Sequence, residues 1–455
     1  MTAATTMAVM TAKRSASTTG TGQRLQCRVL RLEVGAASAA AGVGPLGLAG
    51  ETGFAWRSEA RELVTFGSAA TVPLTTGPGR LERAAAQVAE LLAAIEPDGD
   101  RWGRSEAPLP LAVGALPFDD HTPGQLTIPA VTVERAEDAD PGGSGALWVT
   151  LVGVEGAMPE VPDLHLPLAA SAGASRVRRG GGAWPRVTGV RAVQDGSQWR
   201  AAVQAALGAI AAGRLDKVVL AREVEVLVDR PFPRAALLRR LAERAPGTFV
   251  YADDGFVGAS PELLVARHGR HALARPMAGT VPSGGPSDEE ARRIAWLRAS
   301  GKNASEHRIV ADEVAAALHT VATVVRVAPI EVVRLPTVVH LATRIDANLG
   351  EPPPTALQLA ALLHPTPAVA GLPRAAALAA IAELEPFERD RYAGPVGWVD
   401  AHGDGEWAIA LRCAALSGPR ARLWTGAGIV AGSDPESEWY ETEAKAAAML
   451  DVLIR

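Results

Sequence analysis

The chain contains very little cysteine. Only Cys27 and Cys413 occur among its 455 residues, which excludes a disulfide framework and a thiolate metal cluster. So few thiols fit a reducing compartment, and we expect the protein in the cytoplasm. The sequence also has no apolar run of the about 18 residues that a membrane-spanning helix needs, which argues against a membrane protein.

Neither positive nor negative residues are in large excess. The chain has 45 Lys and Arg against 50 Asp and Glu, for a net charge of −5. Such a balance provides no basic field to attract nucleic acid or an anionic membrane, so we expect neither as a partner. Apolar residues make up 48% and charged residues 21%, which is typical of a globular protein with a sizeable core.

Targeting and nucleotide-binding signals are absent too. The opening residues lack a charged segment followed by an apolar core, and we interpret residues 1–24 as a disordered tail. GVGPLG at 42–47 has the glycine spacing of a dinucleotide loop, but it contains a proline and no helical pattern follows. HGRH at 268–271 is too turn-like for a pair of metal ligands on a helix. No Gly-x-Ser-x-Gly nucleophile motif occurs.

What is present is a mixed pattern of helices and strands. Before about residue 190, Gly/Pro-rich passages separate a predicted helix from short strand-like runs. After it, strands pair locally and helices intervene without strict alternation. This pattern predicts an α+β fold with large, mostly antiparallel sheets packed with helices. The predicted elements are helices at 80–95, 197–213, 305–321 and 356–363, strands at 146–154 and 217–228, a hairpin at 249–260, a strand region at 326–335 and a strand meander at 392–430.

The segment SDPESEWYETEAK near the C-terminus predicts a helix with an acidic face. Asp434 and Pro435 are suited to the N-cap and the first helical position. Glu438, Glu441 and Lys445 follow at i, i+3 and i+7, so they share one face. That face continues into residues expected to be buried, and acids on a buried face need a cationic partner.

A second acid occupies a similar place in SEHRIV. Glu306 lies at the edge of an apolar helical stripe with Val310 and Val314. Alone it reads as an acid stabilised by the helix dipole. Together with Glu438 and Glu441 it gives carboxylates on two inward helix faces without clustered Cys or His, an oxygen-only set suited to Mg²⁺.

Lys217 and Glu262 form a candidate acid–base pair, although each also has a simpler reading. Lys217 begins a strand and shares a face with Val219 and Ala221, and it could simply reach solvent at the strand end. If it is desolvated instead, its pKa falls from about 10.4 toward about 7–8 and it can act as a general base. Glu262 follows Pro261 and is either a turn acid or a carboxylic acid kept protonated by burial.

Ten motifs in these regions resemble, in order, those of the chorismate-utilising enzyme family, and most closely its isochorismate synthase branch. They cover about residues 197–455 and are LDKVVLAR, GASPELL, MAGT, SEHRIV, PTVVHLAT, HPTPAVAGLP, YAGPVGW, GDGE, TGAGIVAGSDPESEW and ETEAKAAAML. The resemblance implies that 25–190 is a divergent N-terminal part of the same sheet domain and that 191–455 is the chorismate-binding catalytic region.

The resemblance also implies roles for individual residues. Lys217 matches the general base and Glu262 the general acid. Glu306 and Glu441 match the Mg²⁺-binding glutamates, with Glu438 as a more distant or water-mediated partner of the ion. The implied reaction adds water at C2 of chorismate and removes the C4 hydroxyl, giving isochorismate, with Mg²⁺ as the only cofactor.

Further positions match residues that contact the substrate. Chorismate is a dianion, so Arg412 and Lys445 also make electrostatic sense without the resemblance. Asn303 stands where relatives often carry an acid, which implies a less acidic environment for the metal. The matched positions are Gly279, Thr280, His340, Ala368, Tyr392, Arg412, Gly426, Gly428 and Lys445.

Alternatives within and beyond the branch remain open at this point. Salicylate synthases continue from isochorismate by eliminating pyruvate, while anthranilate and aminodeoxychorismate synthases use ammonia. Ala368 occupies a position where these relatives usually carry threonine, which favours isochorismate synthase. A non-catalytic relative would lack a key residue, yet Lys217, Glu262, Glu306 and Glu441 are all of the required types. We expect a monomer without an obligate protein partner, serving menaquinone or siderophore biosynthesis.

Overall fold

The computed structural model describes residues 25–33, 44–95, 107–135, 146–154, 157–160 and 184–454. These residues form eight α-helices, one short 3₁₀ helix and 24 strands in three sheets. Their strand pairs are antiparallel, which confirms the predicted α+β class with antiparallel sheets. The tail predicted at 1–24 lies outside the described residues.

The largest sheet has 12 strands. In spatial order they are β1 (Leu25–Glu33), β8 (Ala146–Val154), β7 (Val131–Arg135), β3 (Glu62–Phe66), β2 (Phe54–Arg57), β11 (Phe249–Asp253), β12 (Phe256–Ser260), β23 (Cys413–Ser417), β24 (Arg420–Val430), β10 (Lys217–Val228) and β20 (Gly371–Leu372), with β9 (Val187–Ala192) also paired to β10. The two longest of the C-terminal strands, β10 and β24, pair over most of their lengths.

The second sheet has nine strands and the third has three. The nine are β16 (Ala322–Val327), β19 (Ile345–Leu349), β14 (His271–Arg275), β13 (Leu263–His268), β22 (Gly405–Ile409), β21 (Pro395–Asp400), β5 (Leu111–Ala115), β6 (Gly124–Ile128) and β4 (Ala70–Leu74); the three are β15 (Met277–Pro282), β18 (Val338–Ala342) and β17 (Glu331–Arg334). Both large sheets combine strands from before and after residue 190. The division at that residue stays a prediction.

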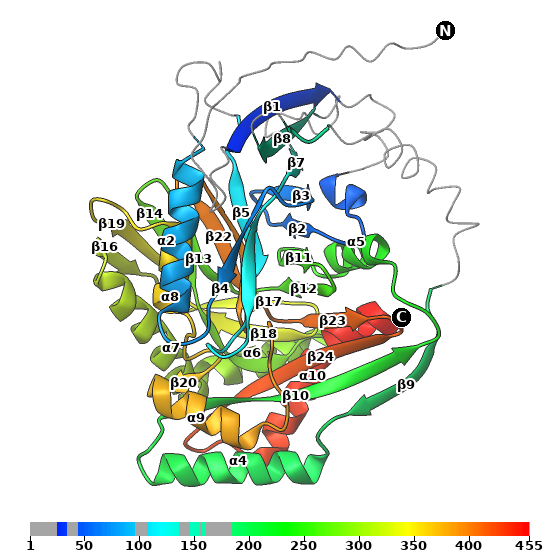
Figure 1. Cartoon of the computed structure of the whole chain (residues 1–455). Helices are drawn as coiled ribbons and strands as arrows, with labels where there is room; N and C mark the ends of the chain where they lie inside the picture. Colours follow the sequence, from blue (N-terminus) through cyan, green and yellow to red (C-terminus); the bar gives the residue numbers. More distant parts are fainter. Residues whose placement is uncertain are drawn as a thin grey trace.

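The helices cover the sheets from outside and fill the space between them. They are α2 (Arg80–Ala93), α4 (Gly196–Ala211), α5 (Arg234–Arg244), α6 (Ser287–Ala299), α7 (Gly301–His319), α8 (Ala356–Leu363), α9 (Arg374–Leu384) and α10 (Pro435–Ile454), with the 3₁₀ helix η1 (Pro45–Leu48). Figure 1 shows α4 and α9 beside β10, and α2 running along α8. None of the described helices is both long and apolar enough to cross a bilayer.

Several predicted elements have the expected bounds, helices α2 and α4 end within two residues of the predicted bounds, and two elements differ more. Strands 146–154 and 217–228 and helix 356–363 are confirmed. Helix α7 begins at residue 301 rather than 305, because Ser300 caps it by accepting a hydrogen bond from the Asn303 amide at 3.3 Å. The single strand region predicted at 326–335 is wrong in detail, since it splits into β16 and β17, which belong to different sheets.

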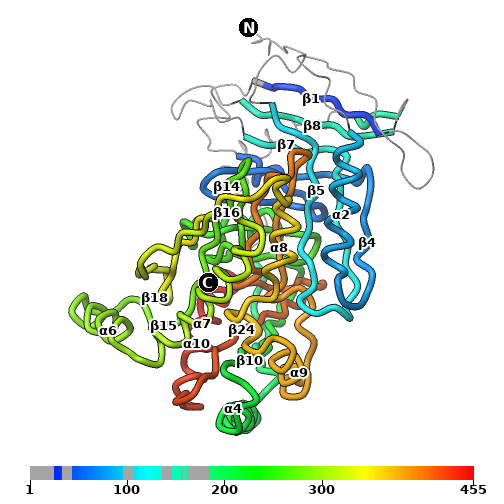
Figure 2. Tube along the Cα trace, turned by 90° about the vertical axis from the view of Figure 1, so that its left-hand side faces the viewer, coloured from blue at the N-terminus to red at the C-terminus, as the bar shows by residue number. Residues whose placement is uncertain are grey.

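Two of the three apolar cores lie against the large sheets. The larger one combines side chains from both large sheets with those of α2, α4, α8 and α9. The other packs α5 and α10 against the 12-stranded sheet. Helices α7 and α10 both contact β24 and β15, and Figure 2 shows α7, α10, β10 and β24 gathered in one part of the molecule. The acidic faces predicted on these two helices are therefore brought to the same strand.

Candidate active site

A cavity lies where β10 and β24 face α7 and α10. Its lining contains all nine predicted substrate-contacting residues together with Glu262 and Glu306. Its volume of about 60 Å³ is small beside the about 300–1,000 Å³ of typical ligand pockets. Charged side chains that line the cavity must therefore move apart to admit a substrate. The lining residues are Val219, Pro261, Glu262, Met277, Ala278, Gly279, Thr280, Glu306, His340, Ala368, Val369, Tyr392, Leu411, Arg412, Gly426, Gly428 and Lys445.

Two glycines of β24 border the cavity, and one of them makes room for charged groups. In the ladder between β10 and β24, Gly428 lies opposite Val219 and Gly426 lies opposite Ala221. A Cβ atom on Gly428 would collide with the Glu306 carboxylate and come within 3.0 Å of the Lys217 side chain. A side chain at this position would therefore fill the space that the ion pair occupies.

Lys217 is buried, not solvent-facing. Its side chain is 0% exposed, and its Nζ lies 3.1 Å from Glu306 Oε1. The reading of Lys217 as a lysine that reaches solvent is therefore wrong, and the alternative of a desolvated lysine is correct. Burial acts to raise the pKa of Glu306, but the charges of Lys217, Lys302 and Lys445 outweigh burial and keep that pKa below its ordinary value.

Glu262 lies in the short connection between β12 and β13. It is buried, and its Oε1 accepts a long hydrogen bond of 3.4 Å from the Met277 amide. Burial raises the pKa of Glu262 from 4.5 to about 7, against the opposing charges of Lys217 and Arg412. The carboxyl group is thus able to exist in its protonated form near neutral pH, where it can donate a proton.

His340 links two other residues of the cavity. Burial, followed by the nearby charges of Arg412 and Lys445, holds the pKa of His340 well below its ordinary value, so its ring is neutral. Arg412 donates to His340 Nε2 at 3.3 Å, which leaves the ring proton on Nδ1, 3.1 Å from Thr280 Oγ1. Arg412 itself adopts a left-handed backbone conformation with φ 48°, a strained geometry for a side chain that often marks functional sites.

The acidic face predicted on α10 is present, and it meets lysines. Asp434 caps the helix by accepting a hydrogen bond from the Ser437 amide at 2.8 Å. Lys445 Nζ donates to Glu441 Oε1 at 2.5 Å and to the Gly426 carbonyl at 3.0 Å. Glu438 is buried and pairs with Lys302 of α7. Burial and the neighbouring charge of Glu441 raise the pKa of Glu438 to about 7.

These carboxylates suit a divalent ion in chemical type. No group of three Asp, Glu, His or Cys side chains stands ready to hold a metal among the described residues. Glu306, Glu438 and Glu441 each pair with a lysine instead. Glu438 and Glu441 lie on the same face of α10, and the charge of Glu441 contributes to the raised pKa of Glu438. Hard oxygen donors of this kind are those that Mg²⁺ prefers. The metal roles of the three glutamates stay predictions.

The sequence patterns missed a buried ion pair behind the cavity. Glu385 accepts two hydrogen bonds from Arg389 and a third, at 2.7 Å, from the Ala221 amide. Arg389 also donates to the carbonyls of Val219 and Val369, at 2.8 and 2.7 Å. The pair therefore fixes β10 and the loop before β20, both of which line the cavity. Only its i, i+4 spacing was a sequence signal, and that spacing is common on helix surfaces.

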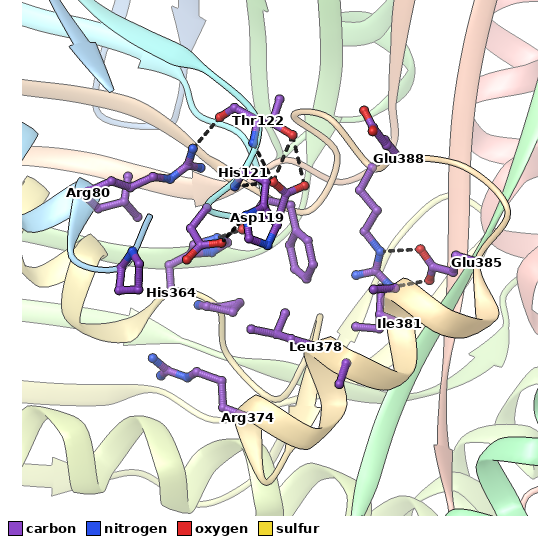
Figure 3. Close-up of a pocket in the computed structure, with 18 of the residues that line it drawn as sticks. Arg80, Asp119, His121, Thr122, His364, Arg374, Leu378, Ile381, Glu385 and Glu388 are labelled. Atoms are coloured by element: carbon purple, nitrogen blue, oxygen red, sulfur yellow. Dashed lines mark hydrogen bonds and ion pairs between the residues drawn. The ribbon is translucent and has the colours of Figure 1, made fainter. Parts of the chain in front are cut away.

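The pair of Glu385 and Arg389 also lines a second, larger cavity. Figure 3 shows this cavity, with Glu385 at its edge, Leu378 and Ile381 below and Asp119 across from them. Its volume is about 1,060 Å³, and none of the predicted site residues lines it. Size alone thus does not identify the site, whereas the convergence of charged groups does.

Comparison with known proteins agrees with this geometry. The profile of the chorismate binding enzyme family matches residues 47–454. The chain is 34% identical over 402 residues to isochorismate synthase DhbC of Bacillus subtilis (strain 168), covering 86% of this chain and 90% of that protein. It is 35% identical over 353 residues to isochorismate synthase EntC of Escherichia coli (strain K12), covering 75% and 81%.

A solved structure extends the likeness to the fold. MenF, the menaquinone-specific isochorismate synthase from Escherichia coli, superposes with a TM-score of 0.71 at 26% identity. The match covers 98% of this chain and 97% of MenF. The family profile, the relatives and the shared fold agree over nearly the whole chain, which therefore belongs to the family of chorismate-binding enzymes.

Proposed function

We propose that this protein is an isochorismate synthase that converts chorismate to isochorismate with the help of Mg²⁺. The carrying observation is that one cavity is lined both by Glu262, whose pKa is about 7, and by Glu306, which pairs with the fully buried Lys217. The relatives named isochorismate synthase, from two organisms, support the same reaction.

The acid and the base have complementary tasks in this reaction. Lys217 takes a proton from a water molecule, whose oxygen forms the new bond to C2 of chorismate. The ring double bonds shift, and the C4–O bond breaks. Glu262 delivers its proton to the departing hydroxyl, which leaves as water, so that one water is consumed and one released. A buried carboxyl group whose pKa lies near neutrality is suited to this donation.

The substrate is a dianion, so positive groups are needed to bind it. Arg412 and Lys445 line the cavity and can pair with the two carboxylates of chorismate. Glu306 and Glu441, with Glu438 behind them, would hold Mg²⁺. The ion would neutralise a substrate carboxylate that these acids would otherwise repel. His340, neutral and fixed by Thr280, adds a hydrogen-bonding group without adding charge.

Removing the metal should test this proposal directly. With chorismate as substrate, we expect isochorismate formation in Mg²⁺ and a loss of at least about 100-fold after EDTA treatment, because a charge-stabilising cation is withdrawn. Adding Mg²⁺ back should restore turnover. Glu441→Gln should raise the Mg²⁺ concentration needed for half-maximal activity.

Glu436 provides the control for that variant. It lies on the same helix, where it is exposed and pairs with Arg200, so Glu436→Gln should leave the Mg²⁺ requirement unchanged. Full turnover in EDTA would contradict the metal assignment, and absence of isochorismate under all conditions would contradict the proposed reaction.

Ala368 provides a test of product specificity. This residue lines the cavity, and related enzymes that eliminate pyruvate usually carry threonine there. We expect Ala368→Thr to release a small but measurable amount of pyruvate, followed with a coupled lactate dehydrogenase assay. Ala368→Val has nearly the same shape without the hydroxyl and should release none. Equal pyruvate from both variants, or none from either, would remove this position as a determinant of the product.

A further inference from the structure

Lys302 holds a place among the proposed metal ligands that the reaction does not explain. Its Nζ pairs with Glu438 across the gap between α7 and α10. The charges of Glu438, Glu306 and Glu441 together outweigh burial and raise the pKa of Lys302. A single ammonium group thus contacts Glu438 and feels the charges of the other two carboxylates that are proposed to serve the metal.

The local helix does not favour a lysine at this position. Lys302 is the second residue of α7, and a positive charge in the first turn opposes the helix dipole. Lys302 and Glu306 are also spaced i, i+4 with the lysine first, which is the weaker order for such a pair. The carboxylates on α10 therefore account for its position better than α7 does.

Lys302 also differs from the other lysines near the site. Lys445 lines the cavity and Lys217 is 0% exposed against Glu306. Lys302 is not among the described lining residues, and 26% of its side chain is exposed, whereas its partner Glu438 is 2% exposed. The lysine can thus turn out to solvent, while the carboxylate cannot leave the site.

We propose that Lys302 is a built-in cation that occupies the acidic site in the metal-free protein and is displaced when Mg²⁺ binds. The ammonium group and the ion carry like charge in the same acidic site, so Glu438 can serve the ion, directly or through a water molecule, only when its pair with Lys302 opens. Lys302 then stabilises the empty site and lowers its affinity for Mg²⁺. This inference rests on the metal site of the proposed function and deepens it.

The test is to measure Mg²⁺ binding by the whole protein without substrate. Lys302→Met removes the charge but keeps a long apolar stem, and we expect its Mg²⁺ dissociation constant to fall roughly tenfold or more, because a charged hydrogen bond no longer has to be broken. Isothermal titration calorimetry gives the constant. The increase in Tm caused by saturating Mg²⁺ gives an independent readout and should be larger in Lys302→Met than in the wild type.

Two controls separate charge from packing. Lys302→Arg keeps the positive charge and should bind Mg²⁺ about as the wild type does. Arg200→Gln removes another cation that pairs with α10, at Glu436, and should change nothing. Weaker or unchanged binding and an unchanged Tm response in Lys302→Met would overturn the inference. If Glu306→Gln and Glu441→Gln leave Mg²⁺ binding unaltered, the proposed metal site itself fails, and the inference with it.

Discussion

Lys217→Ala should lower kcat for chorismate by about 100- to 10,000-fold, the range that a positioned general base contributes. The physical reason is that Lys217 is a fully buried amine whose Nζ lies 3.1 Å from Oε1 of Glu306, a residue that lines the cavity. Isochorismate formation at saturating chorismate and Mg²⁺ measures the loss. Circular dichroism and Tm should show a folded protein, because Glu306 keeps Lys302 and Lys445 as countercharges.

Lys217→Arg distinguishes a base from a mere positive charge. Arginine preserves the charge beside Glu306, but it does not lose its proton in proteins, so it cannot accept one from water. This variant should therefore be nearly as inactive as Lys217→Ala while it retains the ion pair. Substantial activity in either folded variant would remove Lys217 as the base.

Glu262→Gln should cause a loss of similar size, about 100- to 10,000-fold in kcat, because glutamine cannot protonate the departing hydroxyl. The pH profile of the wild type provides a second readout. The pKa of Glu262 is about 7, and the acid must be protonated to act. Activity should therefore fall as the pH rises through about 7.

Although Glu262→Gln lowers activity, it should increase the free energy of unfolding at alkaline pH. The pKa of Glu262 is raised from 4.5 to about 7 on folding, so the folded protein holds this proton more tightly than the unfolded chain does. The bound proton contributes fully to stability below pH 4.5, and this contribution is lost as the pH rises to about 7. Above pH 7 the free energy of unfolding is therefore lower by roughly 3 kcal/mol. Glu262→Gln has no ionisable group there, so it should be more stable than the wild type at pH 8.

Denaturant unfolding at pH 5 and pH 8 measures this difference. Glu223→Gln offers a comparison, because burial also raises the pKa of Glu223 although it lies outside the cavity lining. Glu223→Gln should also be more stable than the wild type at pH 8, but it should keep its turnover. An active Glu262→Gln, or one whose stability follows the wild type at both pH values, would show that Glu262 is not a protonated acid at the site.

The residues of the candidate site could be named from the sequence because their types and order are local properties of it. Residues 217–228 read as a strand and residues 435–450 as a helix with acids on one face, and both are observed. The motifs that contain Lys217, Glu262 and the glutamates were sufficient to indicate the family. Lys302, Glu385 and Arg389 escaped notice, since a lysine or an i, i+4 ion pair is usually a surface feature.

The sequence alone was sufficient to predict the main helices and strands and to single out the charged residues of the candidate site. Only the tertiary structure decided between a solvated and a buried Lys217, and only it showed that Glu262 is buried with its pKa raised to about 7. Both results depend on burial by segments that are distant in the sequence. Lys302 meets Glu438 across 136 positions of sequence, a contact that no local pattern contains.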